Sequence, residues 1–142
     1  MLTMIAMAIK LVIGGVISYV LPSATEKDIK QAVHLKITFM GIIATSLFSV
    51  THHLDAGGPH VLSTGALIFI GILCKTLVDE IQSRHRILFY SLVVIGLFIG
   101  FGYIFQGIIL SFLVYYITVN QSDLFSILIE DDDEQKDDDI NK

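Results

Sequence analysis

The residues from Ile87 to Val119 form an apolar run of more than thirty residues without a charged side chain. As one helix, at about 1.5 Å per residue, this run would be roughly 48 Å long, whereas the hydrocarbon of a bilayer is roughly 30 Å thick. Such a stretch is too apolar to remain exposed to water. We therefore expect the chain that contains it to fold in a membrane.

The composition of the chain supports this expectation. Of its 142 residues, 54% are hydrophobic and 16% are charged, and the mean hydropathy is +0.73. We predict an all-α polytopic membrane protein with four transmembrane helices in residues 1–121, followed by an acidic, disordered tail in residues 122–142. The bilayer is its first expected partner.

The charges are divided unevenly along the chain. From Asp123 onward there are nine acidic residues and two lysines, whereas Met1 to Gln121 contains seven basic and five acidic residues. Blocks of like charge repel one another and stay solvated, which is why we expect the tail to be disordered. The acidic tail and the small number of basic residues exclude nucleic acid as an expected partner.

Four apolar segments are the expected spans: Leu2–Leu21, Ile37–Leu54, Val61–Val78 and Ile87–Val119. The first is predicted to be a retained span and not a cleaved signal sequence, because its positive charge, Lys10, lies inside the apolar stretch. Residues Ser23–Glu26 match a capping box, which predicts that the next helix starts just after Pro22. We expect the third helix to continue past Val78 to Arg86.

Small residues recur at helical spacing in three of these segments. The predicted helix-packing residues are Gly14, Ser18, Gly41, Thr45, Ser49, Gly96 and Gly100. Residues four apart lie on one face of a helix, and small side chains there let a second helix approach closely. We interpret these faces as helix contacts and expect the protein to associate with copies of itself.

The loop Asp55–His60 is the clearest turn, because Gly57, Gly58 and Pro59 do not continue a helix well. A candidate pH-sensing group surrounds it: His52, His53, Asp55 and His60. A metal site is disfavoured because adjacent histidines on a helix point about 100° apart and no HExxH or paired cysteine pattern is present. Three interpretations stay open, namely a metal site, a pH sensor and ordinary interfacial polar residues, of which we favour the last.

Basic residues in the short loops predict the topology. Lys27, Lys30 and Lys36 follow the first span, and the loop after the second span has no lysine or arginine. Lys75, Arg84 and Arg86 lie at the end of the third span and in the loop after it. The positive-inside rule places the first and third loops in the cytoplasm and the N-terminus outside.

The long run allows two topologies, which place the acidic tail on different sides of the membrane. We favour one long, tilted or bent span, because each half of a re-entrant hairpin turning near Gly100 to Gly107 would be short for a crossing. The tail is outside in the first case and inside in the second.

Motifs for catalysis are absent from the sequence. There is no nucleophile elbow, phosphate loop or HExxH, and no cluster of intramembrane carboxylates of the kind that ion-coupled carriers need. We expect neither an enzyme nor a coupled transporter, and we predict no catalytic residue, no metal and no cofactor.

The chain resembles the small phage holins of the LydA-like kind in three stretches: AIKLVIGGVISYV at Ala8–Val20, HLKITFMGIIATSLFSV at His34–Val50 and GALIFIGILCKTLVDEI at Gly65–Ile81. The resemblance rests on hydropathy and glycine placement, and it covers about residues 1–86. It implies a protein that accumulates in the bacterial inner membrane and oligomerises into lesions during phage lysis, so that an endolysin reaches the cell wall. The small-residue faces would then serve self-assembly.

Three functions are therefore carried forward. The first is a holin-like protein that permeabilises the host inner membrane. The second is a structural or accessory subunit of a viral membrane or of a larger membrane complex, with other membrane subunits as partners. The third is a small channel or membrane regulator that uses the histidine-rich loop.

Overall fold

The computed structural model describes residues 1–25, 28–55 and 58–120, and the predicted tail lies outside these residues. The described part contains five helices and no strand: α1 (Leu2–Thr25), α2 (Gln31–Leu54), α3 (Val61–Val78), α4 (Ser83–Gly100) and α5 (Ile104–Val119). The all-α prediction is confirmed. Four helices, α1 to α4, are long and apolar enough to cross a membrane, which fits a multi-pass integral membrane protein, whereas α5 is apolar but has only 16 residues.

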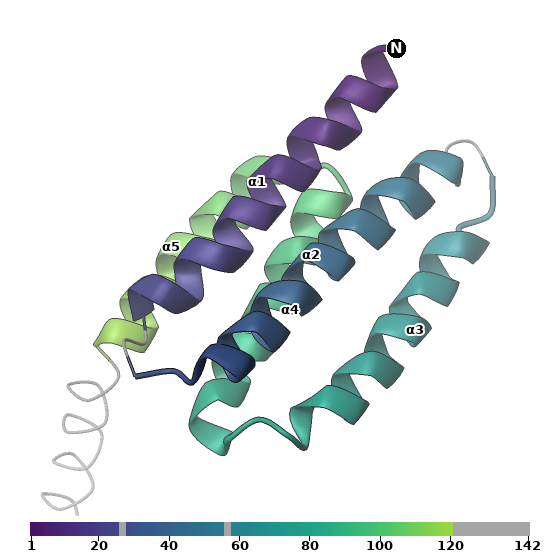
Figure 1. Cartoon of the computed structure of the whole chain (residues 1–142). Coiled ribbons are helices and arrows are strands. Elements are labelled where there is room, and N and C mark those ends of the chain that lie inside the picture. The colour runs from purple at the N-terminus through teal and green to yellow at the C-terminus, as the bar shows by residue number, and fades with distance from the viewer. Residues whose placement is uncertain (26–27, 56–57, 121–142) are drawn as a thin grey trace, which may run out of the picture.

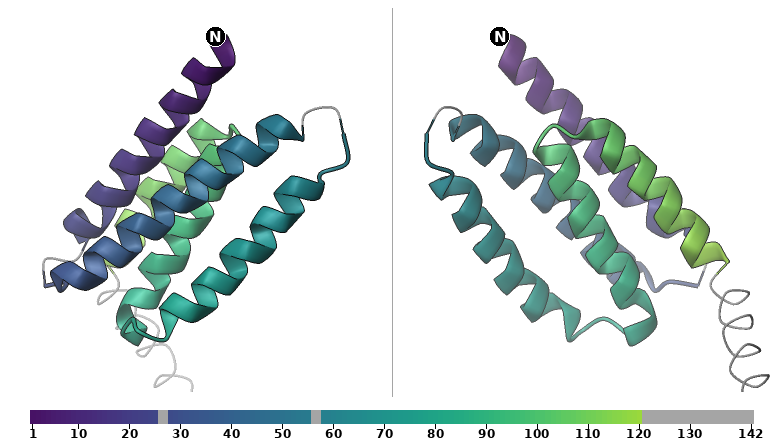
Figure 2. Two further views of the ribbon diagram at one scale, coloured as in Figure 1. Left: turned by 45° about the vertical axis from the view of Figure 1, so that its right-hand side comes forward. Right: turned by 180° about the vertical axis from the view of Figure 1, so that it is seen from behind.

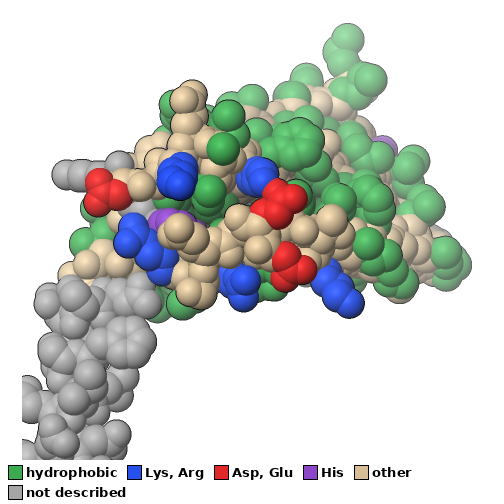
Figure 3. Space-filling view, turned by 60° about the horizontal axis from the view of Figure 1, so that its bottom comes forward, with side chains coloured by type: hydrophobic (Ala, Val, Ile, Leu, Met, Phe, Trp, Pro, Cys, Tyr) green, Lys and Arg blue, Asp and Glu red, His purple; other side chains and the backbone are tan. Residues whose placement is uncertain are grey.

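The helices form a bundle in which α1, α3 and α5 run in one direction and α2 and α4 run in the other (Figures 1 and 2). At one end lie the N-terminus, the α2–α3 loop and the α4–α5 turn. The α1–α2 connection, the α3–α4 turn and the end of α5 lie at the other, which we call the basic end. Lysine and arginine side chains gather there, interspersed with acidic ones (Figure 3).

The centre of the bundle is the contact between α2 and α4, which is the most extensive one between two helices. On α2 the fully buried apolar residues are Ile37, Met40, Ala44 and Phe48, and on α4 they include Leu88, Leu92, Ile95 and Ile99. Both sets follow the three- and four-residue spacing of a helix face. α1 packs on α2 and α4, whereas α3 lies at the edge and contacts mainly α2.

The long apolar run is not one continuous span, as we had favoured, but the hairpin that the sequence had left open. α4 ends at Gly100 and α5 begins at Ile104. Gly102 has a positive φ of 97°, and the amides of Gly102 and Tyr103 donate to the carbonyls of Ile99 (3.0 Å) and Phe98 (2.9 Å). This is a Schellman motif, and the rings of Phe98 and Tyr103, 6.4 Å apart, supply its hydrophobic contact.

The predicted helix start after Pro22 is wrong. α1 runs through Pro22 to Thr25, and the Ser23 hydroxyl donates to the Tyr19 carbonyl of the preceding turn (2.9 Å), so Ser23 lies inside a helix. Glu26, the other half of the predicted capping box, lies outside the described residues. α2 instead begins at Gln31. Proline is tolerated inside membrane helices because neighbouring groups can satisfy the freed backbone.

The third helix ends at Val78 and does not continue to Arg86, as the sequence had suggested. A short turn follows it, and residues from Ser83 onward belong to α4. Glu80 in this turn forms an ion pair with Lys36 near the start of α2. The pair joins α2 to the α3–α4 turn at the basic end, and since both side chains are partly exposed its contribution to stability is at most about 1 kcal/mol.

Candidate functional site

The small residues predicted to pack helices lie together between α1, α2 and α4, in what we call the small-residue seam. It consists of Gly14 and Ser18 on α1, Gly41, Thr45 and Ser49 on α2, and Gly96 and Gly100 on α4, and all seven are buried. The partners of these faces are therefore helices of the same chain. Association between copies would have to use other surfaces.

The α1–α2 half of the seam is reciprocal. A β-carbon added to Gly14 would overlap the side chain of Thr45, and one added to Gly41 would overlap the side chain of Ser18. Each glycine therefore leaves the space that a hydroxyl-bearing residue of the other helix fills. This arrangement sets the register of α1 against α2.

The α2–α4 half brings two backbones close together. A β-carbon on Gly96 would lie 2.8 Å from the Gly41 carbonyl oxygen, and one on Gly100 would lie 2.6 Å from the β-carbon of Phe48. Neither distance is compatible with a real side chain. The GxxxG spacing of Gly96 and Gly100 thus allows an approach that any larger residue would prevent.

One face of α2 is polar and points into the bundle. Thr38, Gly41, Thr45 and Ser49 follow helical spacing along this face, and the three hydroxyl residues are buried. The Thr45 hydroxyl donates to the Gly41 carbonyl (2.9 Å). The hydroxyls of Thr38 and Ser49 have no hydrogen-bond partner among the described residues. An unpaired buried polar group costs about 1–3 kcal/mol.

The residues of the candidate pH-sensing group are not gathered into one cluster. His52 is half-buried and its ring packs edge-on against Phe101 at 5.5 Å, whereas His53 and His60 are exposed. Asp55 is buried. In the part of the chain that the structure describes, no group of three or more potential ligands could hold a metal ion.

Asp55 has a role that the sequence reading did not assign to it. Its carboxylate accepts hydrogen bonds from the backbone N–H groups of Ser63 (2.7 Å) and Leu62 (3.3 Å), which are free donors in the first turn of α3. Burial alone would raise the pKa of Asp55, but these hydrogen bonds and the nearby His60 outweigh it and hold the pKa below its ordinary value. Asp55 thus caps α3 across the loop.

Lys10 is the second residue whose role the sequence left unexplained. Its ammonium donates to the carbonyl oxygen of Gly100 (3.3 Å), and it lies beside Gly102. The Schellman motif satisfies the carbonyls of Phe98 and Ile99 but leaves that of Gly100 free. A cation at the C-terminal end of a helix also complements the helix dipole. Lys10 therefore lies at the end of the bundle, level with the α4–α5 turn.

Comparisons of the chain with models of protein families, with curated proteins and with solved structures find no match.

Proposed function

We propose that the protein is a holin-like pore former: a helical membrane protein whose copies associate in the bacterial inner membrane and permeabilise it. The observation that carries this proposal is the polar face of α2, buried at the centre of an apolar bundle. Gly41 and Thr45 on this face pack α2 closely against α1 and α4, and buried hydroxyl groups also suit a helix that lines an aqueous pore.

Two hydroxyls of this face would gain hydrogen bonds in a second, open arrangement of the bundle. In the closed bundle the hydroxyls of Thr38 and Ser49 are unpaired, and water in a lumen would satisfy both. Opening would separate α1 and α4 from α2 along the small-residue seam and expose this face. The closed structure is then the resting state of the protein.

The surfaces for association between copies are the outer faces of α1, α3 and α5. They carry large exposed apolar residues, among them Ile5, Phe69 and Phe105. In a bilayer such faces contact lipid or another helix. By the positive-inside rule the basic end faces the cytoplasm and the N-terminus faces outward.

The test is induced expression of the full chain in a bacterium, with membrane potential followed by a dye. Wild-type protein is expected to depolarise the membrane. The double variant Thr38→Val, Ser49→Ala is expected to fold at least as stably, because it removes two unpaired hydroxyls, and to depolarise more slowly, because it removes polar lining. Thr76→Val is the matched control, since the Thr76 hydroxyl is exposed on α3 and bonds within its own helix.

Two outcomes would contradict the proposal in different ways. Undiminished depolarisation by the double variant would show that the α2 face does not line the pore. A wild-type protein that accumulates in the membrane without depolarising it would exclude pore formation altogether. A structural or accessory subunit would then be the better interpretation, and co-purifying membrane subunits would support it.

A further inference from the structure

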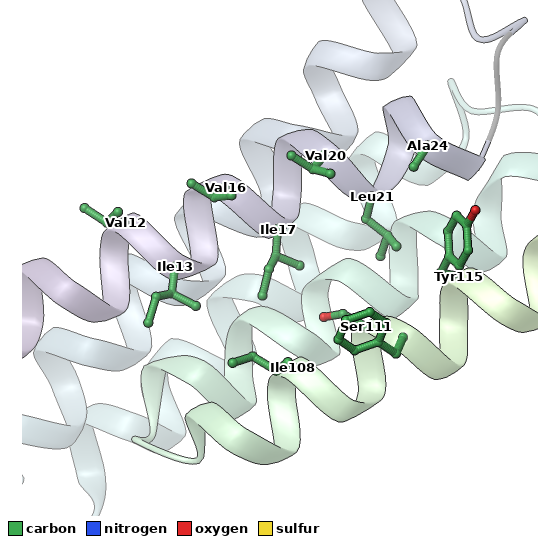
Figure 4. A pocket seen from close by; sticks show the side chains of 11 residues that line it. Val12, Ile13, Val16, Ile17, Val20, Leu21, Ala24, Ile108, Ser111 and Tyr115 are labelled. Atoms are coloured by element: carbon green, nitrogen blue, oxygen red, sulfur yellow. The ribbon is translucent and has the colours of Figure 1, made fainter.

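A groove of about 600 Å³ runs between α1 and α5. On α1 it is lined by aliphatic residues from Val12 to Ala24, and on α5 by Ile108, Ser111, Phe112 and Tyr115 (Figure 4). The groove is open on one side of the bundle. It is separate from the small-residue seam, which lies on the other faces of α1.

The groove remains open because α1 and α5 have no complementary small residues at this contact. Across the seam, glycines accommodate the side chains of the facing helix. Here the lining contains no glycine, and the α1 side presents the branched side chains of Val12, Ile13, Val16 and Ile17. Branched side chains on this face and Phe112 opposite keep the two helices apart.

Almost no atom of the lining needs a hydrogen bond from an occupant of the groove. The Ser111 hydroxyl donates to the Gly107 carbonyl of its own helix (2.7 Å). The hydroxyl of Tyr115 lies at the end of the groove nearest Ala24 (Figure 4). An occupant therefore has to be apolar along its length and can be polar at that one end.

The length of the groove matches one leaflet of a bilayer. From Val12 to Ala24 the helical rise amounts to about 18 Å, and half of the hydrocarbon thickness is about 15 Å. Ala24 is near the end of α1, so the tyrosine end of the groove is at the basic end of the bundle. In a bilayer crossed by this bundle, the basic end would lie at the level of one leaflet's headgroups, where tyrosine is favoured.

We propose that the groove holds one acyl chain of a phospholipid from the leaflet at the basic end. The chain lies against the aliphatic face of α1, and the Tyr115 hydroxyl donates to the ester or phosphate oxygens at its polar end. The site binds the lipid as part of the folded protein and does not depend on the pore proposed above. A second copy of the chain, seated with a helix in the groove, is the competing occupant.

The test uses the full chain reconstituted in nanodiscs with a phospholipid that carries a photoreactive group on its acyl chain. Crosslinked peptides are mapped by mass spectrometry, and lipids that remain bound after transfer to detergent are counted by native mass spectrometry. We expect one retained lipid per chain and crosslinks to α1 and α5. Val16→Trp fills the groove from its exposed rim and should reduce both readouts several-fold.

Ile68→Trp is the matched control, because Ile68 is a similarly exposed aliphatic residue on α3, away from the groove. It should leave lipid retention unchanged. Phe112→Ala, which widens the groove at an exposed position, should weaken retention without filling the site. Crosslinks spread evenly over α1, α3 and α5, or equal retention by wild type and Val16→Trp, would overturn the proposal. A lipid-free dimer that Val16→Trp dissociates would assign the groove to a second copy instead.

Discussion

The ammonium of Lys10 lies 3.3 Å from the carbonyl oxygen of Gly100, 90 positions later in the chain. This contact connects α1 to the α4–α5 turn, at which the long apolar run reverses direction. It also explains how a cation is accommodated near an apolar helix, because it pairs with a carbonyl that the helix end leaves free.

Replacing Lys10 should destabilise the α4–α5 turn. Lys10→Met keeps a flexible apolar stem but leaves the Gly100 carbonyl unpaired, so we expect the free energy of unfolding to fall by about 1–3 kcal/mol. Hydrogen exchange at the amides of Gly102 and Tyr103 should become faster at the same time. Lys10→Arg retains a donor and should lie close to wild type. Equal exchange in all three proteins would show that the contact contributes nothing.

The packing in the small-residue seam predicts that alanine substitution changes stability in opposite directions at two glycines. Gly100→Ala places a β-carbon 3.0 Å from the Thr45 carbonyl oxygen and closer still to Phe48, so α2 and α4 must separate, and overpacking of this kind costs about 1–3 kcal/mol. Gly71→Ala on α3 meets no atom within 4 Å and should stabilise its helix by up to about 1 kcal/mol. Thermal unfolding in detergent measures both changes. If the two variants shift the melting temperature alike, α2 and α4 are not in contact at Gly100.

Gly102 is required by its backbone conformation. Its φ of 97° is one that residues with a β-carbon rarely adopt, and Gly102→Ala should cost about 1–2 kcal/mol. Gly102→Asn should cost less, because asparagine tolerates this region better. Gly58→Ala, at an exposed loop glycine with no neighbour within 4 Å, is the control and should have little effect. If Gly102→Ala leaves the free energy of unfolding unchanged, the chain does not form this hairpin turn.

Asp55 predicts an acid-dependent loss of stability. Its pKa is lowered in the folded protein, so its contribution is complete above the unfolded pKa, about pH 4, and is lost as the pH falls through the lower folded value. We expect Asp55→Asn to have a lower melting temperature than wild type at pH 7, with the difference shrinking below about pH 4. The measurement is thermal unfolding of both proteins between neutral and acidic pH. A difference that stays the same well below about pH 4 would show that the carboxylate of Asp55 does not cause it.

Local patterns predicted the helical, membrane-embedded character of the chain and most of its helix positions. Apolar runs of spanning length identify α1 to α3, and Gly57 to Pro59 mark the turn between α2 and α3. The four-residue spacing of small residues identified the faces that the structure buries. It did not identify their partners, because pairing Gly14 with Thr45 depends on the register of two helices in three dimensions.

The reversal at Gly102 was the less favoured of two sequence predictions for a physical reason. A turn is usually recognised by polar residues that satisfy its backbone, and this one has almost none. Its carbonyls are satisfied by its own amides and by Lys10, which is distant in sequence. One local pattern did indicate the turn. It is a glycine, Gly102, followed by an aromatic residue, Tyr103, that contacts Phe98 in the last turn of the helix.

The side of the membrane on which residue 120 lies tests the hairpin most directly. In a Cys74→Ala background, single cysteines at Ser83, His60 and Asn120 would be labelled with a membrane-impermeant maleimide in spheroplasts and in inverted vesicles. Ser83 and Asn120 lie at the basic end and His60 at the opposite end. We predict that Ser83→Cys and Asn120→Cys react from the same side of the membrane and His60→Cys from the other. If Asn120→Cys reacts together with His60→Cys, the run from Ile87 to Val119 crosses the membrane once, and the hairpin is wrong.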